Sequence, residues 1–184
     1  MIIETERLYI RAMNDADRNL TEQIFAEGAY ANKYRDDPGM YKLMEDANWL
    51  DICQPDTING MIFEKGTCEF CGRVCMQRID DENPEIGIEL LQKKQNQKIG
   101  PEAIVAFCNW YHQEYGIPSI RVRIAEENTH SRHVFEKLGA VYLGRRSNLS
   151  DFVLAWAEAN VPNFNRAELE EEGTHTFSLA LPLQ

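Results

Sequence analysis

A polar segment near the middle of the chain has residues that could bind an anion. It contains Gln95, Gln97, Lys98 and Gly100, and it lies between an apolar strand pattern at residues 86–91 and an amphipathic helix pattern. The first amides of a helix have no intrahelical acceptor, and the helix dipole is positive at that end. A loop that exposes these amides can therefore bind phosphate. The same residues also suit an ordinary strand-to-helix turn with a solvated lysine, so the loop alone leaves both interpretations open.

The segments around this loop must position it. Pro101 fits the first turn of the expected helix, where its missing N–H is tolerated, although it removes one donor to a phosphate. Residues 119–125 are rich in Ile, Val and Arg, which predicts a strand. Asn128 begins a second expected helix, which stops at Gly139. The sequence thus predicts strand, loop, helix, strand and helix in succession.

Four short motifs follow one another over about sixty residues of this stretch. They are Gln95-Asn96-Gln97-Lys98-Ile99-Gly100, Glu102-Ala103, Asn128-Thr129-His130-Ser131 and Glu136-Lys137-Leu138-Gly139-Ala140. Their order and spacing resemble those of the GNAT acyltransferase superfamily, and within it the branch of ribosomal-protein N-terminal acetyltransferases. The opening Thr5-Glu6-Arg7-Leu8, followed by Arg11, is also common in that branch.

Two positions depart from the family pattern. Lys98 replaces the first glycine of the loop, so the backbone must approach the cofactor with a β-carbon present. The lysine also brings a cation to an anion site. Ala140 replaces the usual phenylalanine, which is a difference in packing only.

The resemblance implies a fold and a cofactor. We expect an α/β chain with the GNAT fold, in which a mixed central sheet is splayed between its central strands and flanked by helices. We expect one N-acetyltransferase domain over residues 1–184, with acetyl-CoA as co-substrate and no metal. The pantetheine arm would hydrogen-bond to the exposed strand edge as an added strand would. The expected cofactor-binding residues are Leu90, Leu91, Gln95, Asn96, Gln97, Lys98, Ile99, Gly100, Asn128 and Ser131.

The resemblance also implies where the chemistry takes place. The amides of Leu90 and Leu91 would stabilise the oxyanion that forms when an amine attacks the thioester. An amine is mostly protonated near neutral pH, so a general base would help. Glu85 and Glu89 are the candidates, because residues four apart in a strand share a face and Gly87 between them leaves room. Either could instead be a solvated strand carboxylate.

The leaving thiolate needs a proton or a hydrogen bond. Many superfamily members use a tyrosine seven residues after the asparagine of the last helix, and Phe135 occupies that position here. Ser131 lies four residues earlier on the same helical face and could donate a hydrogen bond to the sulfur. We therefore predict Ser131 as a third catalytic residue, and Asn128 as a helix cap, a cofactor contact or both.

The composition narrows the range of partners. The chain has 184 residues, of which 43% are hydrophobic, enough for a sizeable core. Its 19 basic and 30 acidic side chains give a net charge of −11, which argues against nucleic acid as a partner. The charge suits a cationic acceptor, although acidity also keeps a protein in solution. The basic residues near the expected anion site are Lys93, Lys94, Lys98, Arg132 and Lys137.

The sequence has no apolar leader and no apolar run of membrane-spanning length, so we expect no membrane and a cytoplasmic location. Its five cysteines, an odd number, argue against a disulfide scaffold. Cys68, Cys71 and Cys75 have no nearby fourth ligand and do not converge in a regular strand. We interpret them as small buried side chains rather than zinc ligands.

The outer segments complete the expected fold. Residues 8–12 predict a first strand, and Asn14 offers a cap for a helix that ends near Gly28. A helix at 40–53 follows. Further along we predict strands at 56–64, 69–79 and 174–181, a short helix at 151–159 and a loop at 161–172.

In the family, the early helices form a wall of the acceptor site. Four aromatic residues of this region could therefore contact the acceptor, although aromatic residues at helical spacing more often belong to the core. These are Tyr30, Tyr34, Tyr41 and Trp49.

The sequence predicts an acetyl-CoA-dependent N-acetyltransferase that acts by direct transfer in a ternary complex. The resemblance favours a protein N-terminus as the primary amine. One alternative is a small-molecule amine or an antibiotic. Another is a non-catalytic acyl-CoA-binding module, because of Lys98 and the missing tyrosine. We expect a small molecule or peptide N-terminus as partner, without nucleic acid or membrane, and a monomer or homodimer.

Overall fold

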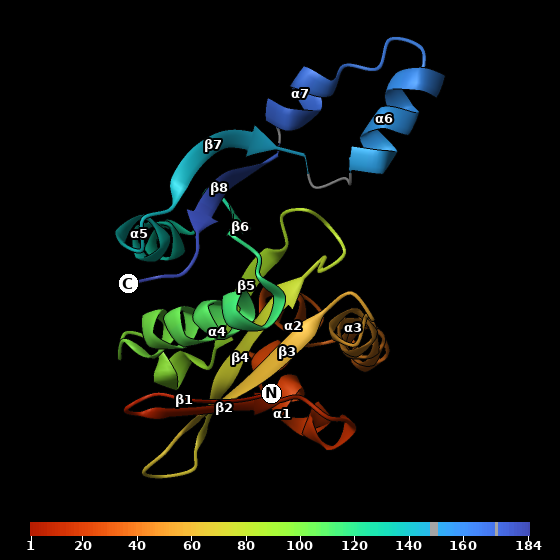
Figure 1. Cartoon of the computed structure of the whole chain (residues 1–184). Helices are drawn as coiled ribbons and strands as arrows, with labels where there is room; N and C mark the ends of the chain where they lie inside the picture. Colours follow the sequence, from red (N-terminus) through yellow and green to blue (C-terminus); the bar gives the residue numbers. More distant parts are fainter. Residues whose placement is uncertain (148–150, 172) are drawn as a thin grey trace. The chain divides into compact units, whose positions relative to one another are not determined.

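The computed structural model describes residues 1–147, 151–171 and 173–184, without the side chains of Tyr30 and residues 151–153 (Figure 1). The chain divides into two compact units. Unit 1 comprises Met1–Pro118 and Leu181–Gln184, and unit 2 comprises Ser119–Ala180.

Unit 1 is built on five antiparallel strands in the order β1-β2-β3-β4-β5. Their bounds are Ile2–Glu4 for β1, Leu8–Ala12 for β2, Ile58–Glu64 for β3, Phe70–Gln77 for β4 and Glu85–Leu90 for β5. Strands β2 to β5 confirm the strands that the sequence predicted, each within two residues at either end. β1 was not predicted, because three residues are too few to show an alternating pattern.

The helices of unit 1 cover both faces of this sheet. They are η1 (Asp15–Asp17), α1 (Arg18–Ala26), α2 (Ala29–Lys33), α3 (Pro38–Ile52), η2 (Gln92–Lys94) and α4 (Ile99–Tyr115). The apolar stripe of α4, which includes Ile104 and Phe107, is buried, and Gly100 lies against Leu90 and Ile88 of β5. On the opposite face, Leu20 and Ile24 of α1 pack against a buried cluster that includes Met61. Each face is thus closed by an apolar contact, which fixes the register of the strands.

The start of the first helical segment follows the predicted cap. Asn14 and Asp17 form a capping box: the Asn14 side chain accepts from the Ala16 amide at 3.0 Å, and Asp17 accepts from the Asn14 amide at 2.9 Å. Arg11 of β2 holds Asp17 through two hydrogen bonds of 2.6 and 2.7 Å. The expected cap at Asn14 is confirmed.

Unit 2 contains three antiparallel strands in the order β6-β8-β7. Its elements are β6 (Ser119–Ile124), α5 (Thr129–Lys137), β7 (Val141–Arg146), α6 (Asp151–Asn160), α7 (Arg166–Glu171) and β8 (Thr174–Ala180). The core includes Ile120, Val122, Phe135, Phe177 and Leu179. The predicted β6, α5, α6 and β8 are confirmed.

Two predictions for unit 2 need correction. The loop expected at 161–172 is wrong for residues 166–171, which form α7. The turn residues precede this helix, where Asn165 accepts from the Ala167 amide at 3.2 Å, and Arg166 pairs with Glu170 one turn later. β7 was missed because Val141, Tyr142 and Leu143 are consecutive exposed apolar residues without alternation.

Among the described residues, none of the helices is long and apolar enough to cross a membrane.

Candidate active site

The predicted anion loop of unit 1 ends where α4 begins. Lys98 is the N-cap of α4 and adopts the left-handed conformation, with φ of 62° and ψ of 11°. Asn96 also has a positive φ, of 59°. Glycine favours this region and other residues rarely adopt it, so Lys98 takes up the conformation for which the family pattern has a glycine. Pro101 is the third helical residue, within the first turn as expected.

The glutamine side chains of the loop donate hydrogen bonds to backbone carbonyls of the same segment. Gln95 Nε2 donates to the Leu90 carbonyl at 3.1 Å, and Gln97 Nε2 donates to the Lys93 carbonyl at 2.7 Å. Arg7 Nη1 donates to the Gln97 carbonyl at 3.1 Å. These bonds hold the loop, while the amides of Ile99 and Gly100, in the first turn of α4, have no intrahelical acceptor. The side chains of Gln95 and Gln97 thus shape the loop, and its backbone is the part suited to bind phosphate.

One of the expected cations does not belong to the loop. The Lys94 side chain is only 7% exposed, and its Nζ lies 2.6 Å from carboxylate oxygens of both Glu64 and Glu69. These two hydrogen bonds raise the pKa of Lys94. Lys94 lies near the loop in sequence, but its charge is already paired with these two carboxylates. Lys93 and Lys98 are exposed.

The strand before the loop offers one amide rather than two. The Leu91 amide donates to the Cys71 carbonyl of the β4 side at 3.0 Å. Successive amides of a strand point in opposite directions, so the Leu90 amide points to the edge of β5 away from β4. Of the two expected oxyanion donors, Leu90 is therefore the one placed to bind a ligand along this edge.

The two candidate bases of β5 have different surroundings. Glu85 is buried at 7% exposure. The Glu89 side chain is 48% exposed, and its carboxylate accepts from Arg73 Nη2 at 2.5 Å and from Arg73 Nε at 3.1 Å. Gly87 between them does not leave open room as expected, because a β-carbon there would lie 2.9 Å from Cys75 Sγ. The glycine makes space for the Cys75 thiol.

Arg73 connects β5 to a polar group on β3. Its Nη1 donates to Asn59 Oδ1 at 2.7 Å, and Asn59 Nδ2 donates to the Ile52 carbonyl at the end of α3 at 2.8 Å. Burial opposes the charge of Arg73, yet Cys75 and Glu89 hold the pKa of its guanidinium above the ordinary value. Arg73 was not predicted as a site residue, because it lies in none of the recognised motifs.

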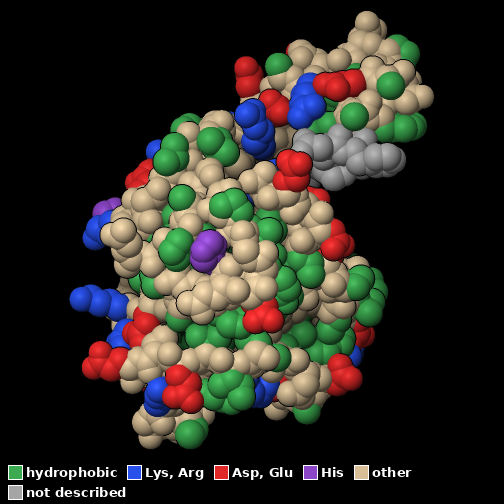
Figure 2. Space-filling model, in the orientation of Figure 1, with side chains coloured by type: hydrophobic (Ala, Val, Ile, Leu, Met, Phe, Trp, Pro, Cys, Tyr) green, Lys and Arg blue, Asp and Glu red, His purple; other side chains and the backbone are tan. Residues whose placement is uncertain are grey.

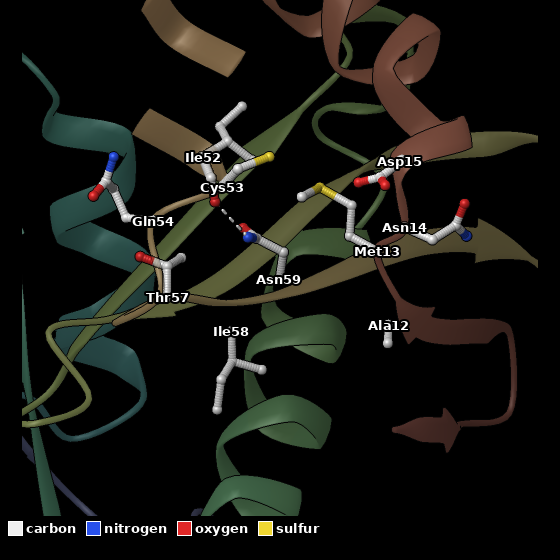
Figure 3. Close-up of a pocket in the computed structure, with 10 residues that line it drawn as sticks. All are labelled: Ala12, Met13, Asn14, Asp15, Ile52, Cys53, Gln54, Thr57, Ile58 and Asn59. Atoms are coloured by element: carbon white, nitrogen blue, oxygen red, sulfur yellow. Dashed lines mark hydrogen bonds between the residues drawn. The ribbon is translucent and has the colours of Figure 1, made fainter. Parts of the chain in front are cut away.

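Asn59 also lines a pocket of about 350 Å³ in unit 1 (Figure 3). The pocket lies between the segment after β2, the end of α3 and the start of β3, and Asp15 lines it from the side opposite Cys53 and Thr57. The strand register places Asn59, Cys75 and Gly87 in one row on the same face. Neighbouring strands are about 4.8 Å apart, so this row spans about 10 Å from the pocket to the middle of β5.

In unit 2, the predicted residues of α5 have separate roles. Asn128 is the N-cap, and its Oδ1 accepts from the Ser131 amide at 3.1 Å, which confirms the predicted cap. Ser131 is half-buried, and Phe135 lies in the core of unit 2. Arg132 pairs with Glu136 at 2.8 Å, so it is already bound to an anion.

The early aromatic residues of unit 1 pack within the protein. Tyr41 contacts the Phe25 ring edge-on at 5.4 Å, Lys33 lies over Tyr34, and Arg18 lies over Trp49. Tyr30 lies outside the described side chains. Tyr34, Tyr41 and Trp49 are each only partly buried, so a contact with an acceptor stays a prediction for them.

The cysteine interpretation holds for two of the three residues. Cys71 and Cys75 are buried, but Cys68 is exposed, with a φ of 56° in the turn before β4. The expectation that Cys68 is a buried side chain is therefore wrong. Within the described part of the chain, no group of three or more His, Cys, Asp or Glu residues could hold a metal ion.

The family model of the acetyltransferase (GNAT) domain matches residues 7–141. The chain belongs to this family. The resemblance carried by the four motifs is thereby confirmed, together with the α/β fold class. GNAT proteins are acetyl-CoA-dependent acetyltransferases, so the protein is a transferase of this kind. No curated protein matches the sequence.

Solved structures with the same fold include enzymes with different acceptors. A GNAT-family acetyltransferase from Bacillus anthracis is 18% identical, with a TM-score of 0.64 and 98% of each chain covered. RimL, a ribosomal alpha-N-protein acetyltransferase in complex with coenzyme A, is 14% identical, with a TM-score of 0.67 and 99% of each chain covered. A chimera of the spermidine N-acetyltransferase SpeG from Vibrio cholerae is 15% identical, with a TM-score of 0.65 and 94% of this chain covered, against 95% of the other.

Proposed function

We propose that this GNAT protein transfers the acetyl group of acetyl-CoA to a primary amine by direct attack in a ternary complex. The observation that carries the proposal is the start of α4, where Lys98 adopts the left-handed conformation of a glycine and the next two amides lack intrahelical acceptors. These amides, together with the positive end of the helix dipole, suit the cofactor's phosphates. Asn96, Ile99 and Gly100 bind through their backbone in this proposal.

In unit 1, we place the remaining chemistry on β5. We assign the oxyanion contact to the Leu90 amide, which points to the edge of β5 away from β4. Glu85 is the preferred base, because a proton on Glu89 would remove the counter-charge of the buried Arg73. In unit 2, Ser131 as a donor to the leaving sulfur and Asn128 as a cofactor contact stay predictions. The family match at 7–141 runs through both units, which supports one catalytic domain.

The acceptor is a primary amine for which the pocket at Asn59 is a candidate site. The pocket is lined by the Asp15 carboxylate and by the polar side chains of Gln54 and Thr57, which suits a cationic or hydrogen-bond-donating group. A protein N-terminus is the first choice, supported by the likeness to RimL. A polyamine is the second, supported by the net charge of −11 and the likeness to SpeG.

The proposed setting is the cytoplasm, with the protein as a monomer or homodimer and without a nucleic-acid or membrane partner. The five cysteines are all unpaired, which suits a reducing compartment. On the face drawn in Figure 2, Lys and Arg side chains are interspersed with Asp and Glu, whereas nucleic-acid binding needs a basic stripe.

A thiol-release assay over an amine panel tests the function. The panel contains peptides with free N-termini, the same peptides with blocked N-termini, spermidine and simple diamines, each with acetyl-CoA. We expect release with free but not blocked peptides, and a thermal shift with acetyl-CoA alone. Turnover of spermidine only would select the polyamine. A thermal shift without turnover of any amine would contradict a primary amine of these classes as the acceptor.

A further inference from the structure

The turn between β1 and β2 is joined to the start of α4 by a dense set of hydrogen bonds. Arg7 Nε donates to Glu102 Oε2 at 2.7 Å, and Arg7 Nη2 lies 2.5 Å from the same oxygen. Thr5 Oγ1 donates to Glu102 Oε1 at 2.5 Å, and the Arg7 amide reaches that oxygen at 3.3 Å. The fourth residue of α4 is thus fixed to a turn about a hundred residues earlier in the chain.

The charges favour this arrangement. Glu102 lies in the first turn of α4, where a carboxylate is stabilised by the helix dipole. Burial opposes its charge, but the hydrogen bonds from Thr5 and Arg7 hold the pKa of Glu102 below its ordinary value. The carboxylate is therefore ionised at neutral pH, and it orients the guanidinium of Arg7.

The same guanidinium reaches the loop. Arg7 Nη1 donates to the Gln97 carbonyl at 3.1 Å. That carbonyl and the Lys98 N–H belong to one planar trans peptide group, in which they point in opposite directions. A bond that fixes the carbonyl therefore also fixes the direction of the Lys98 amide. Lys98 is the N-cap residue of α4, so the direction of its amide is set at the start of the helix.

We propose that Arg7 is a positioning residue for the cofactor: oriented by Glu102 and Thr5, it holds the Gln97–Lys98 peptide group so that the Lys98 amide faces the phosphates of acetyl-CoA. The inference rests on the proposed binding of acetyl-CoA by loop 95–100. It assigns Arg7 no contact with substrate.

A second arginine on the same part of the sheet provides a matched control. Arg11 binds Asp17 through two hydrogen bonds of 2.6 and 2.7 Å, so it makes a similar two-pronged ion pair. It anchors η1, however, and its remaining hydrogen bond goes to the Ala12 carbonyl rather than toward the loop or α4. Arg7→Ala and Arg11→Ala remove comparable ion pairs, and only the first should affect the cofactor.

The experiment measures the melting temperature, the Kd of acetyl-CoA by calorimetry, and kcat and KM for both substrates. For Arg7→Ala we expect the Kd and KM of acetyl-CoA to rise about tenfold, with kcat and the amine KM within about twofold. Arg11→Ala should lower the melting temperature without changing the acetyl-CoA Kd. Arg7→Lys keeps one charge beside Glu102 but loses the forked geometry, so it should restore the melting temperature more than the affinity.

Gly100→Val separates this inference from the proposed function. If Gly100→Val weakens acetyl-CoA binding but Arg7→Ala does not, Arg7 is a structural anchor only and the inference is overturned. If neither variant changes the affinity, the loop does not bind the cofactor and the proposed site fails with it. Should Arg7→Ala not fold, Arg7→Lys and Glu102→Gln give the same comparison.

Discussion

The guanidinium of Arg73 on β4 lies 2.5 Å from the carboxylate of Glu89 on β5. The arginine side chain is 8% exposed, so Glu89 is the main counter-charge of a nearly buried cation. A general base must accept a proton, and a protonated Glu89 would leave Arg73 without that charge. The two candidate bases are thus unequal, although both lie on the same face of one strand.

The first prediction contrasts these two glutamates. Glu85→Gln should lower kcat at neutral pH by about a hundredfold, because the amide keeps the size of the side chain but cannot accept the proton. Part of the loss should return at high pH, where the amine deprotonates without help. Glu89→Gln should instead destabilise the fold by about 1–3 kcal/mol, less than a fully buried pair because Glu89 is half exposed. Rate–pH profiles and denaturant titrations of both variants measure these effects.

The opposite pattern would reassign the base. If Glu89→Gln loses turnover with recovery at high pH while Glu85→Gln keeps it, Glu89 is the base. If both variants keep full activity and still bind acetyl-CoA, no carboxylate of β5 takes the proton.

The second prediction concerns Gly100. A β-carbon at this position would meet Leu90 Cδ1 at 3.5 Å and Ile88 Cδ1 at 3.9 Å, which are ordinary contacts. Gly100→Ala should therefore fold and bind acetyl-CoA nearly as the native chain does. Gly100→Val adds methyl groups against β5, which should shift the start of α4 and weaken binding at least tenfold, about 1.4 kcal/mol. Calorimetry on both variants tests this, and native affinity in a folded Gly100→Val would contradict it.

The sequence was sufficient for elements whose apolar residues form a regular pattern. β2, β3 and β4 have alternating or continuous apolar patterns, and α4 has an apolar stripe, so their types followed from periodicity. β7 was not predicted, because its apolar residues are consecutive and exposed and therefore show no alternation. α7 was not predicted because Pro162 and the asparagines between Pro162 and this helix are turn residues. Their pattern indicated a loop, although a short helix rich in glutamate follows them.

The site was predictable only as far as its local motif. Loop 95–100 and its helix are adjacent in sequence, so their spacing revealed them. The ion pairs Arg7–Glu102, Arg73–Glu89 and Lys94–Glu64 join residues far apart in the chain. With 19 basic and 30 acidic side chains, composition permits many such pairings and selects none. Only the three-dimensional structure shows that Lys94 is paired with two carboxylates and that Arg7 contacts the loop.

The third prediction is a pH dependence of stability that involves Glu102. Its pKa is lowered in the folded state from a reference of 4.5, through hydrogen bonds from Thr5 and Arg7 that outweigh burial. A carboxylate with a lowered folded pKa stabilises the fold above its unfolded pKa, and this stability is lost as the pH falls through the folded pKa. The free energy of unfolding should therefore fall below about pH 5 more steeply in the native chain than in Glu102→Gln. Parallel curves in urea titrations from neutral pH to about pH 3 would show that Glu102 does not contribute.

The last prediction separates the two roles of Lys98, which has a left-handed backbone and an exposed cation. Lys98→Gly and Lys98→Ala both remove the charge, but only glycine adopts this backbone without strain, so the glycine variant should be more stable than the alanine variant by about 1 kcal/mol. If the ammonium group contacts the phosphates, both variants should bind acetyl-CoA more weakly at low salt and lose affinity less steeply as salt is added, because salt screens an exposed charge pair. Calorimetry over a salt series and thermal melts of the three proteins provide the comparison.

Equal salt dependence of acetyl-CoA binding in all three proteins would mean that the Lys98 side chain is only solvated. Weaker binding in the alanine variant alone would mean that the backbone conformation matters to the cofactor and the charge does not.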